Sequence, residues 1–300
     1  MNSVDLREAD PSPGSGILRL DFNPPEERVP GFEIMGLATL HQRRRRRRPD
    51  AVHRVDFHTL TLVTEGSGEH AIDFVTYPCR PGTLLWIRPG QVQRFVRTGT
   101  ANGTRLLFTS AFPPHSSSAD RLVNEWYGPA CRQLGASPDY AVLSTLLGQL
   151  RAEYGRPEQT MSAEILQLLL ATVLLQIDRL PHPDSGADPH AGGEVYTRFR
   201  TELELSYATT RRAADYAHRL GYTVKTLTRA CTAATGQPVK HVIDSRVALE
   251  ARRLLAHTDE PVATIARRLG FPEPTNFGKF FTRLTGLTPR AFRLAHQGQQ

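Results

Sequence analysis

The sequence predicts a multi-domain α+β protein, with an N-terminal β-barrel or jelly roll, two further helices and an all-α C-terminal domain. Its 300 residues suffice for about two domains with separate cores. Short alternating strands occupy His53 to Phe112, whereas the segment after residue 193 has the periodicity of helices. Residues 194–300 hold 17 Lys and Arg against 9 Asp and Glu, a net charge of +8, while residues 1–193 carry −1. The C-terminal part is therefore the one expected to meet a polyanion.

These observations divide the chain into five parts. We expect a disordered leader over residues 1–16, a barrel domain over 17–115, a helical region over 116–180, a linker over 181–193 and a helical domain over 194–296. The leader has early acidic residues and no apolar core, so it is not expected to be a signal or transit peptide. No run of about eighteen apolar residues occurs, and the three cysteines lie far apart without metal-ligand spacing. A reducing, cytoplasmic location and no membrane partner fit these features.

The segment from His53 to Phe112 alternates between apolar and polar residues and is broken by turns such as Pro81–Gly82. This close spacing predicts a small antiparallel barrel whose interior holds one ligand. Four polar or aromatic residues stand on strands otherwise filled with Leu, Val and Ile, and they are the candidate pocket residues: His58, Trp86, Arg88 and Gln93. The alternative is a packed barrel in which these side chains belong to the core or the rim.

Six consecutive arginines, Arg43 to Arg48, precede the first of these strands. Because like charges repel and resist packing, the run predicts a solvated loop. Contact with phosphates, or with an anionic effector, is the functional alternative.

Two apolar-periodic segments after the barrel, Tyr140 to Tyr154 and Ser162 to Leu180, predict amphipathic helices. The apolar stripes comprise Leu143, Leu146, Leu147 and Leu150 on the first helix, and Ile165, Leu168, Leu169, Thr172 and Leu175 on the second. These stripes either pack on the barrel or form an interface with a second copy. The next residues, up to Gly193, are rich in Pro, Gly, Asp and Ser and predict the linker.

The C-terminal part contains a repeated pattern. Helical periodicity covers Val195–Ser206, Arg211–Leu220, Val224–Ala234, Val239–His257, Val262–Leu269, Thr275–Thr285 and Pro289–Ala295. A helix-turn-helix unit needs a small residue at the helix crossing, a Gly with positive φ in the turn, and apolar residues inside the second helix. This pattern surrounds both Gly221 and Gly270, 49 residues apart. Repetition within the basic part favours two tandem units over two ordinary helical hairpins.

The segment Val239 to His257 joins the two units as a predicted helix of 19 residues, roughly 28 Å long at 1.5 Å per residue. That length would hold the second helix of one unit about one turn of DNA away from the second helix of the other. Arg246 falls among the apolar residues of this helix, so an ion pair with an acidic residue such as Glu250 is expected rather than contact with a polyanion.

These residues resemble the AraC-type transcription regulators over about Tyr196 to Arg293. The densest matches are RVALEARRLL from Arg246, IARRLGF from Ile265, NFGKFF from Asn276 and GLTPRAFR from Gly286. The N-terminal strands look like the cupin-type effector domain often found in this family. The resemblance implies a cupin-like barrel, dimerisation helices and two helix-turn-helix units, in a sequence-specific regulator of transcription that reads two adjacent major grooves.

The resemblance also implies partners. These are double-stranded DNA, a small-molecule effector, a second copy in a homodimer, and RNA polymerase. Effector occupancy would bias the placement of the two DNA-binding domains of the dimer, provided that the effector binds one arrangement better than the other. The alternatives are a constitutive DNA binder without ligand, and a metal-dependent cupin enzyme fused to a DNA-binding domain.

Metal-dependent catalysis in a cupin needs several N and O ligands that converge. His58, Glu65 and His70 are available, but Leu60 and Gln93 stand where two further histidines would be needed. We therefore expect no metal, no cofactor and no enzymatic activity.

Burial of Val224, Leu227, Ala230 and Cys231 in the first unit, and of Phe277, Phe280, Phe281 and Leu284 in the second, defines the outward faces of the second helices. The candidate base-contacting residues are Thr223, Lys225, Thr226 and Arg229 in the first unit, and Thr275, Asn276, Lys279 and Arg283 in the second. Among these, Arg229 suits guanine and Asn276 suits adenine. The candidate phosphate contacts are Arg212, Lys240 and Thr288, the expected N-cap of the last helix. For each charge, the alternative is a solvated helix face.

Overall fold

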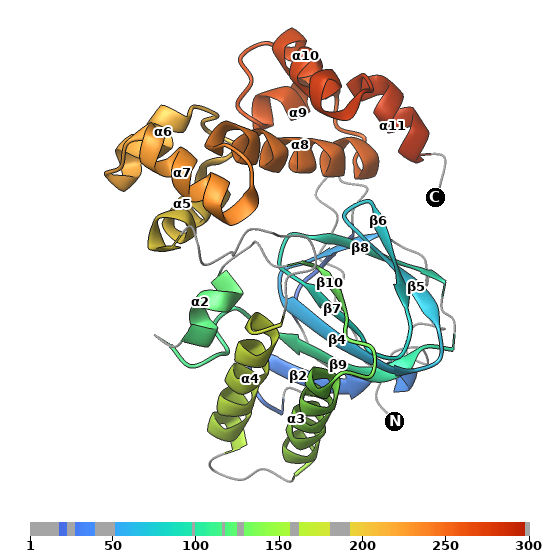
Figure 1. Ribbon diagram of the computed structural model, residues 1–300. Coiled ribbons are helices and arrows are strands. Elements are labelled where there is room, and N and C mark those ends of the chain that lie inside the picture. The colour runs from blue at the N-terminus through green and yellow to red at the C-terminus, as the bar shows by residue number, and fades with distance from the viewer. Residues whose placement is uncertain are drawn as a thin grey trace. The chain divides into compact units, whose positions relative to one another are not determined.

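The structure is a computed structural model, and it describes residues 18–22, 28–39, 52–97, 100–115, 118–124, 129–156, 162–180 and 193–297. The chain forms two compact units; the described residues up to 180 belong to the first and those from 193 to the second (Figure 1). The predicted leader, the run from Arg43 to Arg48 and all of the predicted linker except Gly193 lie outside the described residues. The domain boundaries at these places therefore stay predictions.

The first unit contains two five-stranded sheets. Their strands are β1 (Leu18–Leu20), β2 (Phe32–Gly36), β3 (His53–Val55), β4 (His58–Glu65), β5 (Gly68–Ile72), β6 (Val75–Cys79), β7 (Thr83–Ile87), β8 (Val92–Arg97), β9 (Asn102–Phe108) and β10 (Cys131–Gln133). One sheet has the order β1-β3-β8-β5-β6 and the other the order β10-β7-β4-β9-β2. All pairs are antiparallel except β1 with β3. The predicted series of antiparallel strands is confirmed, whereas β1, β2 and β10 were not foreseen.

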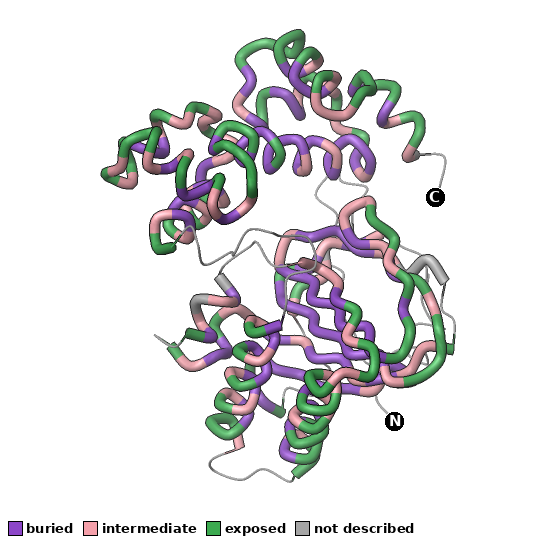
Figure 2. Tube along the Cα trace, viewed as in Figure 1, coloured by how far each residue is buried: buried purple, intermediate pink, exposed green. Residues whose placement is uncertain are grey.

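The second of these sheets is covered on both faces, as the continuous burial of β4 and β7 shows (Figure 2). Side chains of successive residues point to opposite faces of a strand. Leu60 and Leu62 of β4 join a core that includes residues of the helices α2 (Ser118–Asn124), α3 (Pro138–Tyr154) and α4 (Ser162–Asp178). Val63 of β4 instead joins Val55 and Ile72 of the other sheet. The strands thus separate a helical layer from the barrel interior.

The helix α4 is buried on a face beside the apolar stripe for which the sequence left both barrel packing and an interface with a second copy open. Its buried residues are Leu166, Leu170, Val173, Leu174 and Ile177. The predicted stripe lies beside them, and Ile165, Leu168 and Leu175 have relative exposures of 40%, 56% and 40%. The helix is apolar over more than half of its circumference, so periodicity alone does not show which face packs on the barrel.

The second unit is all-helical, with boundaries within about two residues of those predicted. Its helices are α5 (Gly193–Ser206), α6 (Ala213–Leu220), α7 (Val224–Thr235), α8 (Val239–His257), α9 (Val262–Arg268), α10 (Pro274–Thr285) and α11 (Pro289–Gln297). The helix pairs α6–α7 and α9–α10 are the two helix-turn-helix units, and α8 joins them (Figure 1). Gly221 and Gly270, in the two turns, have φ values of 71° and 72°, the left-handed conformation that the repeat required.

Candidate DNA-binding surface and effector site

The first half of α7 presents a polar face to solvent. Thr223 is its N-cap, and the hydroxyl oxygen Oγ1 accepts a hydrogen bond from the backbone N–H of Thr226 at 3.1 Å. Leu227, Ala230 and Cys231 are buried, as predicted, and they turn Lys225 and Arg229 outward. The fourth expected core residue, Val224, is 41% exposed because it occupies the first turn, beyond the edge of the core. Thr226 is half-buried, with its Oγ1 2.9 Å from Thr223 Oγ1.

A corresponding face lies on α10. Its inner side is formed by Phe277, Phe280 and Phe281, which are buried as predicted, while Leu284 is half-buried. Thr275, Asn276 and Lys279 are exposed on the opposite side. Pro274 occupies the first turn, where the missing N–H of proline costs no helical hydrogen bond. The helix therefore begins one residue before the predicted start, and its first turns carry the polar side chains.

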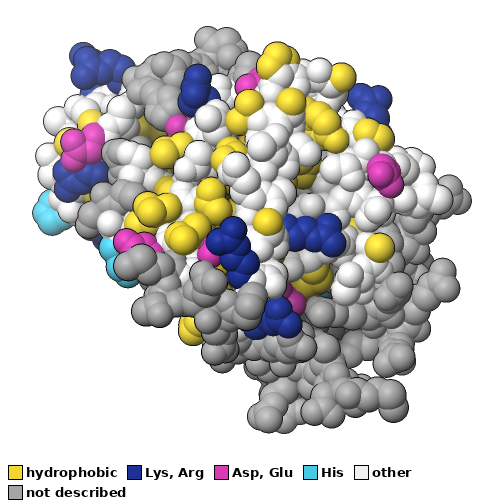
Figure 3. Space-filling view, turned by 90° about the horizontal axis from the view of Figure 1, so that it is seen from below, with side chains coloured by type: hydrophobic (Ala, Val, Ile, Leu, Met, Phe, Trp, Pro, Cys, Tyr) yellow, Lys and Arg dark blue, Asp and Glu magenta, His cyan; other side chains and the backbone are white. Residues whose placement is uncertain are grey.

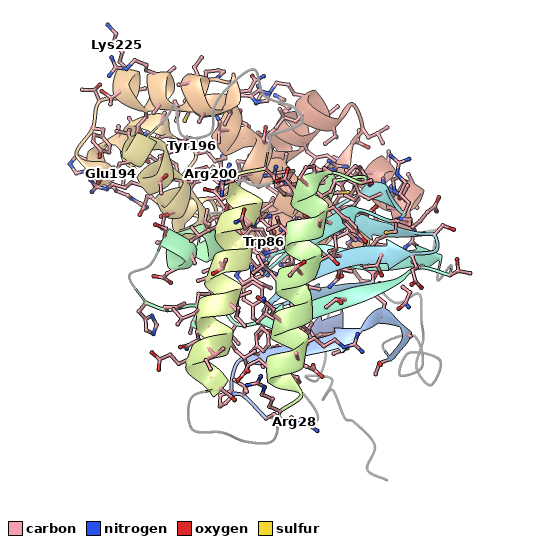
Figure 4. All side chains as sticks on the ribbon, turned by 60° about the horizontal axis from the view of Figure 1, so that its bottom comes forward. Arg28, Trp86, Glu194, Tyr196, Arg200 and Lys225 are labelled. Carbon is pink, nitrogen blue, oxygen red and sulfur yellow. The ribbon has the colours of Figure 1, made fainter. Side chains whose placement is uncertain are left out.

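Three cations on these faces, Lys225, Arg229 and Lys279, form no ion pair with any described residue. In Figure 4, Lys225 points away from the ribbon. Their charges are thus not neutralised within the described part of the chain and are open to a polyanion.

Arg283 and Lys240 behave differently, because both are paired with one buried carboxylate. Arg283 Nη2 lies 3.0 Å from Asp244 Oδ2, and Lys240 pairs with Oδ1 of the same side chain. Asp244 lies on α8 and is 3% exposed, while the side chains of Arg283 and Lys240 are 63% and 55% exposed. Both cations stay at the surface; the pair holds Arg283 of α10 against α8, whereas Lys240 is itself a residue of α8 and pairs within that helix.

The remaining phosphate candidates lie at helix starts. Arg212 is exposed and occupies the N-cap position of α6, with no capping hydrogen bond from its side chain. The hydroxyl of Thr288 accepts a hydrogen bond from the backbone N–H of Ala291 at 3.2 Å, so it caps α11 as predicted. Free N–H groups and the helix dipole make such starts suitable for a phosphate.

Arg246 has the structural role that the sequence suggested. Its guanidinium lies 2.8 Å from Glu204 of α5 and 3.6 Å from Glu250 of α8, and it covers the ring of Tyr207. The prediction of a pair with Glu250 is confirmed. Glu204 was missed, because a partner on another helix leaves no mark in local spacing.

In the N-terminal barrel domain, three of the four candidate pocket residues come together in the core that the sheet shares with the helical layer. Trp86 Nε1 donates to His58 Nδ1 at 3.3 Å, and His58 Nε2 lies 3.1 Å from Ser110 Oγ. Arg88 places its guanidinium 4.1 Å from the centroid of the Trp86 ring. Since the indole N–H can only donate, His58 Nδ1 is an acceptor and Nε2 carries the proton. Burial, with the charge of Arg88, lowers the pKa of His58 to about 3, so the ring is neutral at pH 7.

Gln93 lies apart from these three, in a buried polar cluster between the two sheets. Its Oε1 is 3.0 Å from His70 Nε2 of β5 and 3.4 Å from Arg105 Nη2 of β9, which belongs to the other sheet. The three side chains are at most 4% exposed. Gln93 Nε2 and the hydroxyl of Thr59 are buried and find no hydrogen-bond partner among the described residues. Unsatisfied polar groups are costly, and they mark a place where a ligand would complete the hydrogen bonding.

Two negative observations concern the part of the chain that the structure describes. No three His, Cys, Asp or Glu side chains within it converge in a way that would hold a metal ion. None of its helices has both the length and the apolar character needed to cross a membrane.

Comparisons with known proteins agree with this architecture. Residues 216–295 match the family model of a helix-turn-helix domain, and residues 35–171 match that of the AraC-like ligand binding domain. A ligand-binding barrel followed by such a domain defines a DNA-binding regulator of transcription that responds to a small molecule. The chain belongs to the AraC-type family of these regulators, and the two matches span more than two thirds of its length.

Two relatives with similar sequence are described as transcriptional activators, and a solved structure also aligns with the chain. The transcriptional activator RhaS of Enterobacter sp. (strain 638) is 25% identical over 245 residues, which are 80% of this chain and 86% of the relative. The transcriptional activator RhaR of Mannheimia succiniciproducens is 21% identical over 263 residues, 84% of this chain and 90% of the relative. The crystal structure of ToxT from Vibrio cholerae O395 aligns with 90% of this chain and 100% of its own, at 12% identity and a TM-score of 0.42.

Proposed function

We propose that the protein reads two successive major grooves of one DNA duplex with α7 and α10. The observation that carries this proposal is the pair of solvent-facing polar surfaces at the starts of these helices, where Lys225, Arg229 and Lys279 pair with no acidic residue of the described ranges. The base-contacting set is Thr223, Lys225, Thr226 and Arg229 from α7, and Thr275, Asn276, Lys279 and Arg283 from α10. The side chains of Arg212, Lys240 and Thr288 contact the backbone phosphates and set the register. The helix α8, of 19 residues, joins the two helix-turn-helix units, and its length of roughly 28 Å suits adjacent grooves.

The test is selection of preferred duplexes from a random pool with the full chain, followed by hydroxyl-radical footprinting on the selected site. Two protected patches about one helical turn apart, on one face of the duplex, are expected. Protection of a single patch, or no sequence preference over random duplex, would contradict reading by two helices.

We further propose that a small-molecule effector binds in the barrel interior, beside Gln93, His70 and Arg105. The support is that the Gln93 amide nitrogen and the Thr59 hydroxyl have no hydrogen-bond partner among the described residues, together with the match to a ligand-binding domain. The ligand would offer hydrogen-bond acceptors to the amide and the guanidinium, as hydroxylated or carboxylated metabolites do. His58, Trp86 and Arg88 were expected to line the pocket, and we now propose that they support its wall from the helical side.

Thermal-shift measurements on the full chain, with panels of sugars and small organic acids, test the effector proposal. A binder should raise the melting temperature of the natural protein, and Gln93→Leu should remove that rise while leaving DNA binding intact. A compound that stabilises both proteins equally would bind elsewhere.

A homodimer is the proposed assembly, formed through the exposed face of α4. Ile165, Leu168, Thr172 and Leu175 follow the spacing of the a and d positions of a coiled coil, and Val142 of α3 is 42% exposed. In Figure 3, hydrophobic side chains reach the surface that is seen from below. An apolar stripe of this length is typical of an interface between two copies.

RNA polymerase is a further proposed partner. The support is that the relatives RhaS and RhaR are described as transcriptional activators. Because DNA is the target, we also propose a cytoplasmic location. Retention of purified polymerase on an operator only when the protein is bound beside the promoter would support this partner.

A further inference from the structure

The loop that leads into the first helix-turn-helix unit touches the second unit directly, in addition to the connection through α8. The contact brings the loop between α5 and α6, which leads into the first unit, against the turn between α9 and α10 in the second. Arg211 Nη1 of the loop donates a hydrogen bond to the backbone oxygen of Leu269 at 3.0 Å. The same guanidinium lies 3.6 Å from the centroid of the Phe271 ring. We call this contact, formed by Ala208, Arg211, Leu269, Gly270 and Phe271, the junction.

Phe271 connects the junction to the second recognition helix. Its side chain is 4% exposed, and its ring centroid lies 5.3 Å from that of Phe277 and 5.0 Å from that of Phe280, both on α10. A buried aromatic residue with two ring neighbours has little freedom to shift. Arg211 is therefore separated from α10 by a single, tightly packed side chain.

Gly270 shows how closely the loop and the turn approach. A Cβ atom at this position would lie 2.4 Å from the backbone oxygen of Ala208. The equivalent Gly221 of the first unit has nothing within 4 Å of such an atom. Both glycines satisfy the positive φ of the turn, but Gly270 also lets the loop before α6 pack against the turn of the second helix-turn-helix unit.

Asp244 of α8 adds a third element to this arrangement. Its buried carboxylate holds Arg283 of α10 at 3.0 Å. Burial lowers the pKa of the Arg211 guanidinium, and the charge of Asp244 acts in the opposite direction, so this carboxylate also lies within electrostatic range of the junction. The Asp244 carboxylate thus attracts both Arg211, in the loop before the first helix-turn-helix unit, and Arg283 of the second unit.

We infer that Arg211 is a positioning residue, which fixes the rotation and distance of α10 relative to α7 and makes the protein sensitive to the spacing between its two DNA subsites. A single helix such as α8 bends and leaves its two ends free to rotate slightly. The contact of Arg211 with Leu269 and Phe271 is a second connection between the two halves of the helical domain, and it removes that freedom. The inference rests on the proposed reading of two grooves, because one extra base pair rotates the second subsite by about 35° and displaces it by about 3.4 Å.

The experiment compares the affinity of the full chain for its selected duplex with that for the same duplex carrying one inserted base pair between the two footprints. The natural protein should bind the inserted duplex about tenfold more weakly or worse, the cost typical of a misplaced contact. For Arg211→Ala the ratio should fall to about threefold or less, and Arg211→Lys should recover part of it through its charge. Arg267→Ala, an exposed residue of α9, removes the same charge and should keep the natural ratio.

The ratio is taken within one protein, so a loss of folded material in a variant cancels. Equal ratios for the natural protein and Arg211→Ala would overturn the positioning role alone. A natural protein that tolerates the insertion, or protects one patch, would instead overturn the reading of two grooves on which the inference rests. A reduced ratio for Arg267→Ala as well would show an effect of net charge and likewise overturn the role of Arg211.

Discussion

Arg229 is the exposed arginine at the centre of the α7 face, and its effect on specificity is the most direct test at the scale of single residues. Arg229→Ala should cost about 1–3 kcal/mol on the selected duplex and relax the preference at one base position, because bidentate contacts discriminate between bases. Competition binding against single-position variants of the duplex measures this effect.

Lys240→Ala is the matched comparison. Lys240 pairs with Asp244 and is proposed to meet a phosphate, so its loss should weaken binding to all sequences alike and reduce the salt dependence. Equal losses on selected and random duplex for Arg229→Ala would remove Arg229 from the base-reading set.

His58 makes stability depend on pH. Its pKa is lowered from 6.5 to about 3 by burial and by the charge of Arg88. Between these two pH values the ring is therefore protonated in the unfolded chain and neutral in the folded chain. The stabilisation is present above pH 6.5 and is lost as the pH falls toward 3, by about 1.4 kcal/mol per pH unit. Urea unfolding at pH 6.5 and pH 5 should thus show a loss of about 2 kcal/mol from this group.

His58→Gln serves as the control, since glutamine does not titrate. Its free energy of unfolding should be lower at pH 7, where the ring contacts are lost, but should fall less steeply with acid. Parallel curves for the two proteins would show that His58 is not the group responsible.

Single residues were predictable where local geometry decides their role. Thr223 and Thr288 were assigned as caps and Arg246 as an ion-paired residue, and the structure confirms these assignments. The pocket candidates were harder, because β4 and β7 are buried on both faces and carry no polar side that would indicate the interior. His58 and Gln93 therefore looked equivalent in sequence but occupy different cores. Arg105 was missed because its partner Gln93 lies on a strand of the other sheet, and Asp244 was missed because its partner Arg283 lies 39 residues further along the chain.

At the scale of elements, the two turns offer a matched pair of substitutions. Gly221→Ala places a Cβ atom in open space and should cost about 1–2 kcal/mol, the price of a left-handed alanine. Gly270→Ala meets the same backbone penalty and also the Ala208 oxygen at 2.4 Å, so it should cost clearly more. Chemical denaturation of both variants measures the difference, and equal costs would mean that the loop moves aside freely.

The helices of the C-terminal domain were predicted to within about two residues, because caps, turn glycines and apolar periodicity agree there. The strands β1 and β10 contain three residues each, too few to show alternation. For α4, the sequence showed that the helix is apolar without showing which face meets the barrel. The stripe was expected either to pack on the barrel or to form an interface with a second copy, and its partial exposure favours the second alternative.

At the scale of the whole molecule, dimerisation through α4 predicts a specific loss of assembly. Leu168→Glu places a charge on a side chain that is 56% exposed, so the fold of the single chain should persist while the dimer separates into monomers. Sedimentation velocity of the natural protein and the variant measures the change. Val75→Glu, on a strand residue that is 48% exposed, is the control and should remain dimeric. A dimeric Leu168→Glu protein would locate the interface elsewhere.

The junction has a consequence for how the DNA-binding unit melts. Two helix-turn-helix units that were linked by α8 alone would be free to lose structure one after the other on heating. Because Arg211 and Gly270 also connect the loop before the first helix-turn-helix unit to the second, the whole helical domain should unfold in one all-or-none step. The calorimetric and van't Hoff enthalpies of its heat-absorption peak should then agree. Arg211→Ala should broaden that peak, so the contact that sets the spacing on DNA also makes the two units a single cooperative folding unit.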